Sequence, residues 1–220
     1  MADVLDPDRI VPPEALLPAL RRRASGRYPV DPFGLDPQLA DLVSPVFAAA
    51  LRVRVSGGEH LPATGPGVVV SNRGFGVVEP AAIAVAVQRA CGRRLRVVGA
   101  PDLPFLGAAV RRLGGISSSS PDVAAVLRAG HLVGIPLAPT WLRTGAGEAP
   151  VAVARALTLS PIIPAAVRAA GRFGGVFGAW EVTFGPIVTL ADPYDPEDPL
   201  AAAGFTDAMR QAVGDLLESQ

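Results

Sequence analysis

The chain has 220 residues, of which half are apolar and 18% are charged, a composition that supports one buried core and excludes a wholly disordered or fibrous protein. Its 24 glycines and 23 prolines predict many short elements joined by turns, and they exclude a long coiled coil. The 20 basic and 20 acidic residues balance, so no overall field favours nucleic acid. Every basic residue is arginine, which excludes chemistry that needs a lysine amine.

The cysteine content and the first residues indicate the cellular compartment of the protein. Cys91 is the only cysteine, so an internal disulfide and a cysteine-based zinc site are excluded and a reducing compartment is favoured. The acidic, proline-broken start lacks the basic residues and apolar core of a signal peptide, and no apolar run is long enough to span a membrane. We therefore expect a cytoplasmic protein, with membrane contact confined to the inner face, and neither a metal nor a cofactor.

Residues 1–35 read as an N-terminal arm, because prolines recur through them and a short apolar run leads into Arg21, Arg22 and Arg23. The arm could be an amphipathic piece whose arginines meet anionic lipid, and the alternative is a solvated basic cluster at a helix end. Residues 36–220 follow as one domain.

The domain alternates short helices and short strands. Capping residues, prolines and apolar spacing predict helices at residues 36–51, 80–89, 105–113, 120–129, 149–159 and 200–217. Short apolar runs between turn signals predict strands at residues 52–55, 68–71, 95–99, 132–135, 162–167 and 180–184. This order predicts an α/β fold, a mainly parallel sheet sandwiched by helices.

A glycine-rich turn at residues 72–76 joins a predicted strand to a predicted helix, which is where open α/β sheets bind ligands. The turn fails as a dinucleotide fingerprint, since Glu79 occupies the third glycine position and would repel a pyrophosphate.

Four blocks of sequence resemble, in order and spacing, those of the glycerolipid acyltransferases, which move an acyl chain from a thioester to a lysophospholipid or glycerol phosphate. The blocks are residues 57–72, 113–116, 127–134 and 160–167. The resemblance extends over about residues 30 to 190 and implies the α/β sandwich of that family. It also implies contacts with an acyl chain or lipid at Asn72, Phe75, Phe105, Leu106, Thr140, Trp141 and Arg143.

The catalytic positions of that family are not retained. Its first motif is Asn-His followed by Asp, in which the His takes the proton from the acceptor hydroxyl and the Asp orients the imidazole. Here Arg73 stands in place of the His, and an arginine stays protonated and cannot act as a base near neutrality. Glu79 could replace the orienting acid, and we expect an Arg73–Glu79 ion pair across the mouth of the site.

The third block departs as well. The family's Pro-Glu-Gly-Thr-Arg falls on residues 137–141, so that Thr140 survives while Ala138 and Trp141 replace the acidic residue and the phosphate-binding arginine. After the second block, where the family places another arginine, the chain has Ser117, Ser118, Ser119 and Ser120.

Three interpretations of these serines stay open: a helix cap with a polar loop, a nucleophile, and an anion site on the helix that follows. Five arginines could form a basic face near these serines, and the alternative is that each of them is separately solvated. They are Arg93, Arg94, Arg96, Arg111 and Arg112. The two histidines, His60 and His131, are expected on the surface, away from Arg73.

These observations predict a degenerate member of the family that binds an acyl chain, an acyl thioester or a phospholipid without turnover. An active acyltransferase and an interaction module that binds a protein but no lipid are the alternatives. Nucleic acid is not an expected partner, and a membrane surface is.

Overall fold

The computed structural model describes residues 18, 21, 25–26, 28–72, 78–99, 106–137, 158–170, 178–188 and 198–219. Its helices are α2 (Pro37–Ala50), the 3-10 helix η1 (Gly58–His60), α3 (Glu79–Cys91), α4 (Leu106–Arg112), α5 (Ser120–Arg128) and α7 (Pro199–Glu218). Its strands are β1 (Val53–Ser56), β2 (Gly67–Asn72), β3 (Leu95–Val98), β4 (Gly115–Ile116), β5 (Leu132–Leu137), β6 (Ile162–Ala170) and β7 (Ala179–Phe184).

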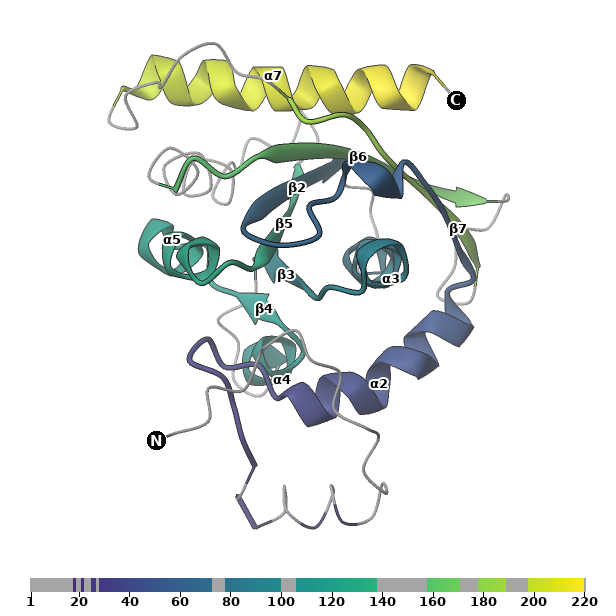
Figure 1. Ribbon diagram of the computed structural model, residues 1–220, viewed down its shortest axis with the longest axis vertical. Helices are drawn as coiled ribbons and strands as arrows, with labels where there is room; N and C mark the ends of the chain where they lie inside the picture. Colours follow the sequence, from purple (N-terminus) through teal and green to yellow (C-terminus); the bar gives the residue numbers. More distant parts are fainter. Residues whose placement is uncertain are drawn as a thin grey trace.

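One mixed sheet organises the domain, with the strand order β1-β7-β6-β2-β5-β3-β4 (Figure 1). The pairs from β6 through β2, β5 and β3 to β4 are parallel, while β7 runs antiparallel to β6 and parallel to β1. The α/β class and the mainly parallel sheet expected from the sequence are confirmed.

The central strand β2 is buried on both faces, as its continuous apolar run predicts. Val68 and Val70 point to the side covered by α5 and α7, whereas Val69 points to the side covered by α3. Figure 1 shows α7 lying across β6 on the side opposite to α3. Two apolar layers therefore sandwich the sheet and hold its strand ends in fixed positions.

The sequence locates most elements and misses two features. The two-residue strand β4 lies where the sequence indicates the end of a helix. It is missed because a strand so short has no alternation to detect. Strand β6 continues to Ala170, three residues past the expected end. The helix expected at residues 149–159 lies, except for its last two residues, outside the described residues.

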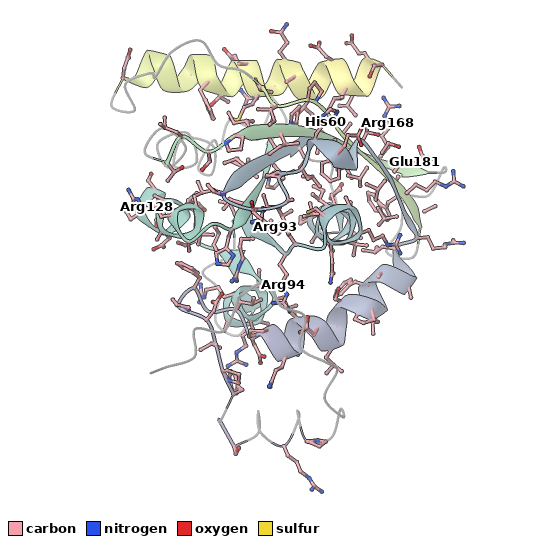
Figure 2. The ribbon with its side chains drawn as sticks, viewed as in Figure 1. His60, Arg93, Arg94, Arg128, Arg168 and Glu181 are labelled. Carbon is pink, nitrogen blue, oxygen red and sulfur yellow. The ribbon has the colours of Figure 1, made fainter. Side chains whose placement is uncertain are left out.

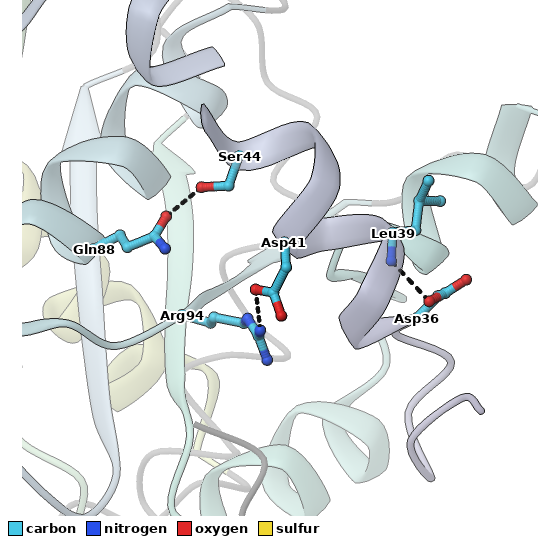
Figure 3. A network of polar contacts seen from close by, with 6 residues as sticks. All are labelled: Asp36, Leu39, Asp41, Ser44, Gln88 and Arg94. Carbon is cyan, nitrogen blue, oxygen red and sulfur yellow. Dashed lines mark hydrogen bonds and ion pairs between the residues drawn. The ribbon is translucent and has the colours of Figure 1, made fainter. Parts of the chain in front are cut away.

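Helix α2 forms where Asp36 and the apolar spacing predict it, with the Asp36 carboxylate accepting a hydrogen bond from the Leu39 amide at 2.9 Å. None of its residues is buried, however. Its polar side faces the domain: Asp41 pairs with Arg94 at 2.5 Å, and the Ser44 hydroxyl donates to Gln88 of α3 at 2.5 Å (Figure 3). Val46 and Phe47 are left 67% and 38% exposed.

The segment before α2 packs against the edge of the sheet. One carboxylate oxygen of Asp31 accepts hydrogen bonds from the amides of Phe33 and Leu35, and the other pairs with Arg96 of β3. Leu35 is buried and the Asp36 amide donates to the Arg112 carbonyl. The last residues of the expected arm thus contact the domain, and the division at residue 35 stays a prediction.

Candidate functional site

The candidate site lies at the carboxyl end of β2. Asn72 is the last residue of this strand and Glu79 the first of α3, and both flank the glycine-rich turn noted in the sequence. Open α/β sheets bind ligands at this edge, outside the carboxyl ends of their parallel strands. Residues 73–77 lie outside the described residues, so the expected Arg73–Glu79 pair stays a prediction.

Asn72 holds the end of β2 to β6. Its side-chain nitrogen donates to the Val167 carbonyl at 2.9 Å, and its side-chain oxygen accepts from the Val167 amide at 2.7 Å. The amide side chain thus imitates one more residue of the ladder, which otherwise ends at the pair Ser71–Ala165. Asn72 has a structural task in this position, and its expected contact with lipid stays a prediction.

Glu79 is buried, with 8% of its surface exposed, and it lies in the first turn of α3 followed by Pro80. A carboxylate in this position interacts favourably with the positive end of the helix dipole. Glu79 therefore lies at the start of α3, on the far side of the glycine-rich turn from Asn72.

Neither histidine lies near this edge. His60 ends η1, whose Gly58 lies against Ala90 in the last turn of α3, so about 15 Å of helix separates it from Glu79. His131 precedes β5, at the end opposite to Leu137, the residue paired with Asn72. Six strand residues place His131 about 20 Å from the candidate site.

The expectation that both histidines lie on the surface is wrong for His131. Only 4% of its surface is exposed, and its ring makes an edge contact with Phe33 at a centroid distance of 5.7 Å. The segment before α2 covers it, which the sequence alone could not show.

The serine run begins helix α5. The Ser119 hydroxyl accepts a hydrogen bond from the Asp122 amide at 3.3 Å, which confirms the capping interpretation. The Ser117 hydroxyl donates to the Asp122 carboxylate. These bonds, from Ser117 and then from Ser119, lower the pKa of Asp122 below its ordinary value of 3.8, while partial burial opposes the shift. The carboxylate occupies the first turn, where an anion would bind, and the anion site at Ser117, Ser118, Ser119 and Ser120 stays a prediction.

The expected basic face is wrong for three of its five arginines, because they bind oxygen atoms inside the domain. Arg93 donates to the carbonyls of Pro62 and Gly130 at 2.9 and 2.5 Å. Arg94 and Arg96 pair with the acidic residues described above, and Arg96 is only 1% exposed. Figure 2 shows Arg93 and Arg94 among the elements of the domain.

The remaining two arginines lie at the end of α4. Arg111 is partly exposed, and the Arg112 guanidinium lies over the Tyr28 ring at 5.0 Å from its centroid.

Most of the other expected contacts fall outside the described residues, namely Arg73, Phe75, Phe105, Thr140, Trp141 and Arg143. Leu106 begins α4. Their roles in acyl-chain or lipid binding stay predictions. Among the described residues, no cluster of histidine, cysteine and acidic side chains could hold a metal ion. None of the described helices is long and apolar enough to cross a membrane.

No residue pattern indicates Val167 as the partner of Asn72, because the backbone amide and carbonyl that Asn72 binds are the same in every residue type. Arg168, the next residue, was not expected at this edge either. An isolated arginine in an apolar run was the available signal.

Comparison with known proteins supports the fold. No family model matches the chain. An uncharacterized protein of Mycobacterium leprae is 37% identical over 53% of this chain and 35% of its own length, so the chain spans about a third of that relative. An uncharacterized protein of Mycobacterium tuberculosis strain H37Rv is 26% identical over 88% of this chain and 70% of its own length.

Among solved structures, the chain is similar to the 1-acyl-sn-glycerophosphate (LPA) acyltransferase PlsC from Thermotoga maritima. The TM-score is 0.50 with 16% identity, covering 81% of this chain and 78% of PlsC. The protein therefore has an acyltransferase-like α/β fold.

Proposed function

We propose that this protein binds an acyl chain, an acyl thioester or a phospholipid on an acyltransferase-like fold and does not transfer the acyl group. The observation that carries the proposal is the distance of both histidines from the carboxyl end of β2. Base-catalysed acyl transfer needs an imidazole within hydrogen-bond reach of the acceptor hydroxyl. Since the chain has only two histidines, and both lie at the other end of the domain, no imidazole is available.

The residues around the turn support the same conclusion. Arg73 occupies the position that the family resemblance assigns to the base, and a guanidinium cannot accept a proton near neutrality. Glu79 could replace the orienting acid of that family, but it would have no imidazole to orient.

A lipid surface is a further proposed partner, reached through the apolar side of α2. Val46 and Phe47 face solvent because Asp41 and Ser44 hold the polar side of this helix against the domain. Leu113, beyond α4, is 44% exposed. Apolar side chains presented in this way favour insertion between lipid headgroups.

The proposal is tested on the purified full chain by native mass spectrometry for co-purified acyl species. A free-thiol assay with long-chain acyl-CoA and lysophospholipid is run on the same sample. We expect bound acyl species and no thiol release above the blank. Acceptor-dependent thiol release would show an active acyltransferase, and the lack of any bound lipid would favour a module that binds only protein.

A second experiment addresses the lost base. The variant Arg73→His is expected to remain inactive in the thiol assay, because Ala138 and Trp141 also replace functional positions of the family. A substantial turnover by Arg73→His alone would show that the rest of the site is competent.

Sedimentation with vesicles that contain anionic lipid tests the surface contact. The double variant Val46→Ser, Phe47→Ser should lose most of its vesicle binding while its free energy of unfolding falls by only about 1 kcal/mol, since Val46 is 67% and Phe47 38% exposed. Vesicle binding equal to that of the unaltered chain would exclude α2 as the contact.

A further inference from the structure

The chain before α2 crosses the end of the sheet at which β5 begins, and we call residues 28–36 the N-terminal strap. These residues form turns and extended chain without a helix or a strand, so their position depends on side-chain contacts and a few backbone hydrogen bonds. At one end of the strap, the Arg112 guanidinium lies 5.0 Å from the centroid of the Tyr28 ring. At the other end, the Asp36 amide donates to the Arg112 carbonyl at 3.0 Å.

Between these ends, the strap covers one residue of β3 and the residue that precedes β5. Asp31 pairs with Arg96, and the Phe33 ring makes the edge contact with His131. Arg96 and His131 both face the α5 side of the sheet, because their sequence neighbours belong to the core on the α3 side. Arg96 is paired in register with Val133, two residues past His131, so the Cα atoms of Arg96 and His131 are about 8 Å apart.

His131 lies near more positive than negative charge. Arg96 is on the adjacent strand, and Arg93 donates at 2.5 Å to the carbonyl of Gly130, the residue before His131. The acidic group of the strap, Asp31, has one oxygen on Arg96 and the other on amides of the strap itself. Only 4% of the surface of His131 is exposed, so an imidazolium here would lose most of its hydration beside two cations.

The neighbouring elements add no negative charge close to the ring. Strands β2 and β5 contain no charged residue. Arg111 and Arg112 end α4, and Arg128, in the last turn of α5, is exposed. The carboxylate of α5, that of Asp122, lies in the first turn, at the other end of the helix. The neutral imidazole is therefore the form on which the strap packs.

We propose that the N-terminal strap is a pH-sensitive latch, which protonation of His131 detaches from β3 and β5. Histidine is the side chain whose ordinary pKa, about 6.5, lies between pH 5 and 8. The attached strap disfavours the proton and the detached strap admits it, so attachment is strongest above this pH and weakens as the pH falls. Detachment exposes the apolar side chains of Phe33 and Leu35. The latch is independent of lipid binding at the candidate site.

Hydrogen exchange followed by NMR on the full chain, between pH 7.5 and 5.5 and without lipid, tests the latch. This range stays above the pH at which carboxylates ordinarily titrate. The probes are the amides of Phe33, Leu35 and Asp36, which donate to Asp31 or to Arg112. Their protection, corrected for the intrinsic pH dependence of exchange, should fall about tenfold, because one ordinary histidine gains its proton on detachment. The amides of β5 should keep their protection.

Variants of the two histidines identify the titrating group. His131→Phe keeps an aromatic ring under Phe33 and cannot be protonated, so its strap should stay protected at every pH of the series. His131→Arg carries a permanent charge and should leave the strap detached even at pH 7.5. His60→Phe is the matched control, since His60 is the only other histidine and lies on η1; it should retain the tenfold change.

Three results would overturn the latch. The first is unchanged protection of the strap in the unaltered chain. The second is a tenfold loss that persists in His131→Phe, which would assign the effect to another group. The third is an equal loss in β5, which would show unfolding of the whole domain.

NMR titration of the His131 ring in the unaltered chain decides the matter if a variant fails to fold. The midpoint of this titration should coincide with the loss of strap protection. A ring that titrates while the strap stays protected refutes the latch. Since no lipid is present, the latch can fail while the proposed function stands, and the reverse.

Discussion

At the scale of single residues, a polar side chain at the candidate site forms hydrogen bonds with the backbone of a neighbouring strand. Asn72 is the clearest case, because both polar atoms of its side chain bond to Val167. From the sequence alone, an asparagine at the end of a buried strand could bind a ligand or could bond to the backbone at the strand end. The choice between them depends on β6, which lies 95 positions further along the chain.

We expect Asn72→Ala to lower the free energy of unfolding by about 2 kcal/mol, because the Val167 amide and carbonyl lose their partners in a part-buried position. Urea denaturation followed by circular dichroism measures the change. Gln211→Ala, at an exposed position of α7, is the control and should change stability by less than about 0.5 kcal/mol. Equal stability of the two variants would show that the clamp contributes nothing.

The hydrogen bonds of Asp122 predict a pH effect. Because the pKa of Asp122 is lowered in the folded state, its stabilisation is present above the unfolded pKa and is lost as the pH falls through the folded pKa. Ser117→Ala should therefore raise the pKa of Asp122 toward 3.8, and NMR titration of the carboxylate measures it.

The same variant should be less stable than the unaltered chain at pH 7. Well below pH 3.8, where Asp122 is protonated in both proteins, this difference should shrink. A stability difference that persists unchanged into acid would assign the effect to packing and not to the carboxylate.

At the scale of elements, α2 is attached to the domain by polar contacts beside the apolar packing of Ala48. Arg89, in the last turn of α3, connects α3 to β1 and to α2 through hydrogen bonds. Its guanidinium donates to the Val53 carbonyl of β1 at 2.5 Å and to the Ala48 carbonyl of α2 at 2.9 Å. The second carbonyl is among the last four of the helix, which have no partner within it.

Arg89→Met keeps the aliphatic stem and removes both hydrogen bonds. We expect a loss of about 1–2 kcal/mol in the free energy of unfolding, because charged donors to carbonyls contribute this much when partly buried. The matched control is Arg128→Met on α5. Hydrogen exchange should show faster exchange in α2 of the Arg89 variant, and an unchanged rate there would mean that Arg89 does not anchor the helix.

At the scale of the whole molecule, one buried ion pair ties the segment before α2 to the sheet. Arg96 of β3 and Asp31 pair across 65 positions of sequence, and Asp31 also accepts the amides of Phe33 and Leu35. This arrangement holds Phe33 over His131. The Asp31 carboxylate therefore joins the N-terminal segment both to itself and to β3.

Asp31→Asn is expected to cost about 3 kcal/mol, because it leaves the Arg96 charge buried without its counter-charge. The double variant Asp31→Asn, Arg96→Met should cost clearly less than the sum of the two single changes. Additive losses in urea denaturation would show that the two residues act independently.

Several features could be predicted from the sequence because they depend on residues close together in the chain. Apolar runs and turn signals located six of the seven strands in the part of the chain that the structure describes, and Asp36 and Ser119 cap the helices that follow them. The arginine-only basic set and the single cysteine are likewise properties of the sequence.

The tertiary structure alone decided which polar groups are exposed and which are bound to other groups of the protein. Arg93, Arg94 and Arg96 look like a basic surface in the sequence, yet they are bound to carbonyls and carboxylates. His131 is buried, and Val46 and Phe47 of α2 are exposed. Each of these outcomes depends on a partner supplied by a distant segment. Local spacing determines which elements form, and packing between distant segments determines which faces and charges they leave exposed.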